Sequence, residues 1–87
     1  MSIKVYSPFL IQYTENQSVF EMNGKTVREC LHNLMKQFPK LNLFDKNHKL
    51  LPYVEVSVNG VYCPPETLAN PVKDGDELHI FVVLAGG

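Results

Sequence analysis

One helical segment, beginning at Thr26, constrains the fold of this chain more than any other part of it. Thr26 with Glu29 three residues later has the form of a capping box, in which each side chain bonds a backbone N–H that the first helical turn leaves free. Pro39 prevents the helix from continuing. Apolar residues recur at spacings of three and four and form one stripe: Val27, Leu31, Leu34, Met35 and Phe38. A lone helix with one such stripe is expected to pack on a sheet.

Strand-like segments precede and follow this helix. Residues 3–6 alternate apolar and polar side chains, and 17–22 predicts a second strand that the Asn23-Gly24 turn signal closes. After the helix, residues 54–58 alternate in the same way, and Asn59-Gly60 is the preferred turn of a two-residue hairpin into a fourth strand. The segment from Glu77 to Leu84 predicts the last and longest strand.

The intervening segments do not extend a sheet. Residues 39–52 are irregular, with three probable anchors, and prolines bracket residues 64–71. The anchors are Leu41, Leu43 and Phe44. The element order is therefore β-β-α-β-β-β, which predicts an α+β fold of the β-grasp type, with one main helix packed across one face of a mixed sheet.

Length and composition narrow the function classes. With 87 residues the chain has material for one core, so residues 1–84 are predicted to form a single domain and 85–87 a flexible tail. A net charge of −1 argues against a nucleic-acid partner. Cys30 and Cys63 lack the spacing of a metal site, and we expect buried thiols. No segment approaches a membrane span, and a cytoplasmic location is expected.

The usual parts of an enzyme active site are missing from the sequence. There is no phosphate-binding loop, no nucleophile elbow and no zinc-protease motif. His32, His48 and His79 are dispersed, and we interpret each as a surface or strand-face histidine. Asp74 and Asp76 flank a glycine, which indicates a turn rather than a metal site. We expect no catalysis by this chain alone, no metal and no bound cofactor.

The sequence ends in an unusual way, because an apolar strand runs directly into Ala85-Gly86-Gly87. Two residues without side chains can thread a narrow channel in a partner enzyme. The carboxylate of Gly87 would be ionised at neutral pH and able to attack the α-phosphate of ATP, with the nucleotide and magnesium supplied by that partner. A sulfur nucleophile could then convert the acyl adenylate to a thiocarboxylate. The alternative interpretation is that the two glycines are merely a frayed, disordered chain end without a function.

These residues resemble the MoaD/ThiS family of ubiquitin-like sulfur carriers. The resemblance rests on the segment 73–78 with its D-G-D turn, on the diglycine end at Gly86-Gly87, and on the strand 53–60 with its V-N-G turn. It covers most of the chain, and residues 8–16 and 39–51 look variable. The resemblance implies that Gly87 is adenylated by an E1-like enzyme, that a sulfurtransferase supplies persulfide sulfur, and that a downstream synthase accepts it. The pathway stays open among molybdopterin, thiamine, cysteine and related metabolites.

Two other functions remain open on the sequence. The chain could be a ubiquitin-like modifier that conjugates Gly87 to lysines, or a β-grasp interaction module with an incidental diglycine. If alternate residues of the last strand face the core, His79, Phe81 and Val83 lie on the opposite face of the sheet and form a predicted docking patch. The alternative is that residues 9–11 cover this strand.

Overall fold

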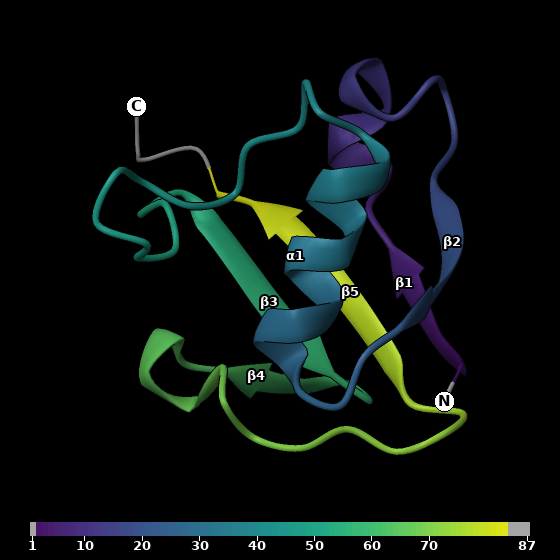
Figure 1. Ribbon diagram of the computed structural model, residues 1–87, viewed down its shortest axis with the longest axis vertical. Coiled ribbons are helices and arrows are strands. Elements are labelled where there is room, and N and C mark those ends of the chain that lie inside the picture. Colours follow the sequence, from purple (N-terminus) through teal and green to yellow (C-terminus); the bar gives the residue numbers. More distant parts are fainter. Residues whose placement is uncertain (1, 84–87) are drawn as a thin grey trace.

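The computed structural model describes residues 2–83. It contains one sheet, one α-helix and two short 3-10 helices, in the order that Figure 1 shows. The elements are β1 (Ser2–Tyr6), η1 (Pro8–Tyr13), β2 (Val19–Asn23), α1 (Val27–Gln37), β3 (Val54–Val58), β4 (Val61–Cys63), η2 (Pro65–Thr67) and β5 (Glu77–Val82). The expected order β-β-α-β-β-β is confirmed.

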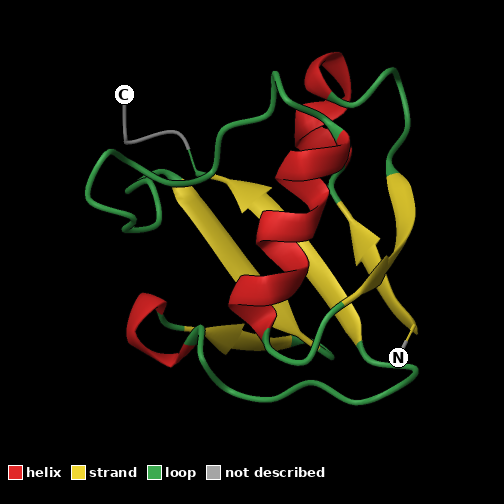
Figure 2. Cartoon of the chain, in the orientation of Figure 1, coloured by secondary structure: helices red, strands yellow, loops and turns green. Residues whose placement is uncertain are grey.

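The sheet is mixed, as expected, and its strand order is β2-β1-β5-β3-β4. β5 lies at the centre, parallel to β1 and antiparallel to β3. The two outer pairs, β1 with β2 and β3 with β4, are antiparallel. Helix α1 crosses one face of this sheet (Figure 2). The last strand in the chain therefore receives hydrogen bonds on both edges, which fixes it firmly in the fold.

Helix α1 begins as the sequence predicts. The Oγ1 atom of Thr26 accepts a hydrogen bond of 3.1 Å from the backbone N–H of Glu29. The carboxylate of Glu29 accepts from the N–H of Lys25 rather than from that of Thr26, so the box closes one residue early. The stripe is buried except for Met35, which is partly buried, and it also includes Cys30. The predicted stripe omitted Cys30, because its thiol was expected to be buried but was not assigned to this face of the helix.

The core lies between α1 and the inner face of the sheet. From the helix side it receives the apolar stripe, and from the irregular segment after the helix it receives the three expected anchors. Those anchors are buried: Leu41 (3% exposed), Leu43 (0%) and Phe44 (5%). Residues 39–52 contain no helix or named strand, only an isolated bridge between Phe44 and Leu50.

Some predicted boundaries were wrong. β2 begins at Val19, not at residue 17, and it ends at Asn23, one residue beyond the predicted end. Asn23 therefore belongs to the strand and not to the turn that was expected to close it. The fourth strand, expected over residues 61–62, extends to Cys63 as β4. β5 ends at Val82, although the N–H of Val83 still donates to a backbone carbonyl; Leu84 lies outside the described residues. The 3-10 helix η1 was not predicted. Within residues 2–83, no helix is both long and apolar enough to cross a membrane.

Candidate functional site

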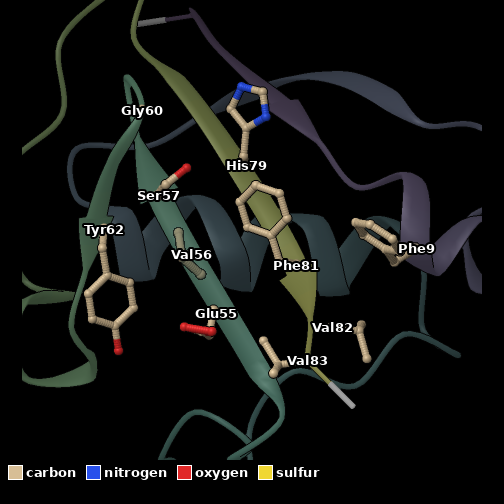
Figure 3. Close-up of a pocket in the computed structure, with 10 residues that line it drawn as sticks. All are labelled: Phe9, Glu55, Val56, Ser57, Gly60, Tyr62, His79, Phe81, Val82 and Val83. Atoms are coloured by element: carbon tan, nitrogen blue, oxygen red, sulfur yellow. The ribbon is translucent and has the colours of Figure 1, made fainter.

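The outward side chains of β5 lie where the period of two places them. Leu78 and Ile80 are fully buried, whereas Phe81 is 39% and Val83 43% exposed. His79 is partly exposed and points to the same side as Phe81 (Figure 3). The face of the sheet opposite α1 therefore carries an apolar patch on its central strand, in the orientation that the sequence predicts.

A shallow groove runs along this face beside β5. Its walls are Phe81 and Val83 on one side and Tyr62, from the edge strand β4, on the other (Figure 3). Glu55 and Ser57 of β3 form the floor between them. We call these residues the sheet groove. Because Ser57 is the register partner of both His79 and Tyr62, one row of side chains crosses three strands.

The imidazole of His79 is held by aromatic stacking. Its ring lies 4.5 Å from that of Tyr6, with an interplanar angle of 15°, and 6.1 Å from that of Phe81. Its Nε2 atom is 3.9 Å from a carboxylate oxygen of Glu77. The three rings form a stacked row on the open face, which leaves His79 less rotamer freedom to lose when a partner covers it.

The 3-10 helix η1 flanks the groove without covering it. The ring of Phe9 lies 6.2 Å from that of Phe81, at an angle of 48°, and is itself 59% exposed. Residues 9–11 therefore cover the outward face of the last strand only in part, through Phe9, and leave Phe81 and Val83 exposed. The exposed ring of Phe9 also enlarges the apolar surface beside β5. Phe9 belongs to a segment whose sequence has no periodic pattern.

The D-G-D segment before β5 is a turn that holds three parts of the chain together. The carboxylate of Asp74 accepts from the N–H of Ser2 at 2.7 Å. Gly75 adopts a positive φ of 89°, which favours glycine. Asp76 accepts from the side chain of Asn59 at 3.0 Å and from the backbone N–H of Lys73 at 2.7 Å. The hydrogen bond from Asn59 is the main reason that the pKa of Asp76 is lowered.

The remaining candidates have structural surroundings. His32 stacks on Phe44, with centroids 4.6 Å apart, and partial burial, followed by the charge of Arg28, lowers its pKa. Cys30 is buried, and burial raises the pKa of its thiol to about 11. Cys63 is buried as well. Residues 2–83 contain no cluster of three or more histidine, cysteine or acidic side chains arranged to hold a metal ion.

The residues predicted to carry the chemistry are not in this part of the chain. Ala85, Gly86 and Gly87 lie outside the described residues. The last described residue, Val83, lines the sheet groove, and its N–H donates to the carbonyl of Tyr53 at 2.7 Å. The chain thus leaves the described structure from the rim of the exposed apolar face.

Comparison with known proteins decides the family. The sequence model of the ThiS family matches residues 8–87, which is nearly the whole chain. The chain belongs to the ThiS family. ThiS-family proteins are ubiquitin-like sulfur carriers, small proteins that typically work as non-catalytic partners of enzymes. No curated protein matches the chain in sequence at a significant level.

Solved structures agree with membership of the ThiS family. A chain of the BexX/CysO complex of Amycolatopsis orientalis is 30% identical, with a TM-score of 0.85 over 98% of this chain and 99% of that one. SAMP1 of Haloferax volcanii is 22% identical, with a TM-score of 0.85 over the whole of both chains. A chain of the complex of subunits 1 and 2 of molybdopterin-converting factor from Helicobacter pylori is 21% identical, with a TM-score of 0.65 over the whole of both chains. The expected ubiquitin-like β-grasp fold is confirmed.

The sheet groove also contains residues that sequence reasoning did not select for a site in this ThiS-family chain. Tyr62 and Glu55 enter it because β4 and β3 pair beside β5. The one available signal was the hairpin turn at Asn59-Gly60, which pairs β3 with β4. The pairing of β3 with β5 spans some twenty residues and has no local signature.

Proposed function

We propose that this chain carries sulfur on the carboxylate of Gly87 and donates it in the biosynthesis of a cofactor or metabolite. The pathways that the family resemblance suggests are those of molybdopterin, thiamine, cysteine or a related compound. The observation that carries the proposal is the match to the ThiS family over residues 8–87, which runs through the diglycine itself. The outward side chains of β5, which are exposed and lie shortly before that diglycine in the sequence, are consistent with a docking surface.

The chemistry follows from the carboxylate. One oxygen of the Gly87 carboxylate attacks the α-phosphorus of ATP, and pyrophosphate leaves, so that an acyl adenylate forms. The terminal sulfur of an enzyme persulfide then attacks the acyl carbon, and AMP leaves. A second enzyme thiol then attacks the enzyme sulfur of the resulting acyl disulfide, so that a disulfide forms between the two enzyme sulfurs and the thiocarboxylate is released. ATP and Mg²⁺ are bound by the partner enzyme, and Ala85 and Gly86 thread its channel because they have almost no side-chain bulk.

The proposed partners are an E1-like adenylating enzyme, a sulfurtransferase or other persulfide donor, and a downstream synthase. Support comes from two of the similar structures, since one is a complex of CysO with BexX and another is a complex of two subunits of molybdopterin-converting factor. His79, Phe81 and Val83 are the side chains proposed to dock on these partners, since they lie on the open face of the sheet.

Exchange of labelled pyrophosphate into ATP tests the adenylation step. The full chain with its adenylating enzyme is expected to support exchange, whereas deletion of Gly86 and Gly87 abolishes it. A variant with a bulky residue added after position 87 is expected to be equally inactive, because its side chain cannot enter the channel. Exchange that persists in the deletion variant would show that adenylation does not need the diglycine, and it would contradict the proposal.

The alternative function is conjugation of Gly87 to lysine amines of other proteins. SAMP1, whose fold this chain shares, is not similar enough in sequence to decide between the two. Both functions begin with the same acyl adenylate. Peptide mass spectrometry separates them, because branched peptides that carry Gly87 on a lysine side chain arise only from conjugation.

A further inference from the structure

The open face of the sheet contains three glutamates on or beside the docking face, and their surroundings differ. Glu21 of β2 and Glu77 of β5 are both register partners of Lys4, which lies between them on β1. The third, Glu55 of β3, has Phe81 as its register partner. In the register of the sheet, Glu21 and Glu77 therefore stand opposite a cation, and Glu55 stands opposite an aromatic ring.

The carboxylate of Glu55 is also without a partner in the structure. Among residues 2–83 it takes part in no hydrogen bond and no ion pair, whereas a carboxylate oxygen of Glu77 lies 3.9 Å from the Nε2 atom of His79. Glu55 is partly buried and lies in the sheet groove between Tyr62 and Val83 (Figure 3). Water is therefore what solvates this charge in the free protein.

A partner that covers Phe81 and Val83 must also cover Glu55. The bound partner would then exclude water from the carboxylate of Glu55. This loss of hydration disfavours docking unless the partner places a cation beside the carboxylate. The aromatic rings on both sides of Glu55, those of Tyr62 and Phe81, suit one cation better than another. A guanidinium is planar, can bond both carboxylate oxygens at once and can lie against an aromatic face, whereas an ammonium cannot combine these contacts.

We propose that the sheet groove binds an arginine of the adenylating partner, with its guanidinium on the carboxylate of Glu55 and between the rings of Tyr62 and Phe81. This inference rests on the proposed function, and it adds the chemistry of the partner's surface: apolar side chains against Phe81 and Val83, and one arginine against Glu55. Glu55 is a specificity-determining residue, because a partner without that cation leaves its charge dehydrated.

The test is the dependence of pyrophosphate exchange on carrier concentration, with the cognate adenylating enzyme as the probe. E55Q, which keeps the shape and removes the charge, is expected to raise the KM for the carrier by about tenfold or more at unchanged kcat. E55D, which keeps a carboxylate, loses less. The matched control is E66Q, since Glu66 lies exposed on η2, outside the groove, and its KM should equal that of wild type.

Ionic strength provides the second readout. The KM of the wild-type carrier is expected to rise more steeply with salt than the KM of E55Q, because only the former includes the ion pair. A KM for E55Q that equals or falls below the wild-type value overturns the inference. In that case exchange with the wild-type carrier would still support the proposed function. No exchange with wild type and its cognate enzyme overturns the proposed function, and the inference with it. Circular dichroism of E55Q checks that its fold is native.

Discussion

Replacement of Phe81 by aspartate would remove the largest side chain of the proposed docking patch, which consists of His79, Phe81 and Val83. Phe81 is 39% exposed, so of about 200 Å² of aromatic side chain about 80 Å² remains for a partner to cover. At about 25 cal/mol per Å², the loss of that contact costs about 2 kcal/mol, or about thirtyfold in Kd. The new carboxylate would also stand opposite Glu55, which adds repulsion between like charges.

The same substitution affects the fold less than the docking. Loss of the part of Phe81 that the free protein already covers, about 120 Å², costs at most about 3 kcal/mol of folding free energy. Repulsion between the new aspartate and Glu55 adds up to about 1 kcal/mol. A domain with ordinary stability of about 5–15 kcal/mol remains folded after such a loss. Binding is therefore compared well below the melting temperature of the variant.

Calorimetric titration of the adenylating enzyme with each carrier measures the effect, and far-ultraviolet circular dichroism checks the fold. The matched control is Val61→Asp, because Val61 is 69% exposed and pairs with Val58 at the edge of the sheet, outside the sheet groove. The control should bind like wild type. Binding of F81D within about threefold of wild type, at a native spectrum, refutes the assignment of this face to docking.

Three further predictions concern the lead-in turn and the core. D76N should melt below wild type at pH 7, because it lacks the carboxylate that accepts from Asn59 and Lys73. The pKa of Asp76 is lowered in the folded state, so this stabilisation is fully present above about pH 4. The difference in melting temperature should vanish as the pH falls through that lowered pKa. G75A should lose about 1–2 kcal/mol in urea denaturation, since φ is 89° and nothing else lies within 4 Å of the added Cβ. Cys30, with a pKa of about 11, should resist alkylation at pH 8 until urea unfolds the chain; equal rates in native and unfolded protein would contradict its burial.

The helix and the last strand could be predicted from sequence because their signals are local. Thr26 and Glu29 mark the start of α1 within one turn, and the period of two places Phe81 and Val83 outward without any knowledge of neighbours. The 3-10 helix η1 has no such signal. It is held partly by Thr14, whose buried hydroxyl donates to the carbonyl of Leu10 within η1 at 3.2 Å, and no periodic pattern predicts this contact.

Glu55 shows why the groove itself could not be predicted. In the sequence it resembles Glu21 and Glu77, since each is a glutamate on a strand with alternating residues. The three differ in burial, since Glu55 is partly buried and the other two are exposed, and in their register partners. The register partners are set by strand pairings between separate parts of the chain. The position of Glu55 opposite Phe81, rather than opposite a cation, can be recognised once the order of the five strands is known.

The intact mass of the chain isolated from its own cells tests the central claim most directly. Fragmentation of the protein then locates any change of mass along the chain. The account predicts a population in which one oxygen of the Gly87 carboxylate is replaced by sulfur, and which disappears when the adenylating enzyme is deleted. A chain that ends at Gly87 with an unmodified carboxylate, in cells that contain the active enzyme and a persulfide donor, would contradict it.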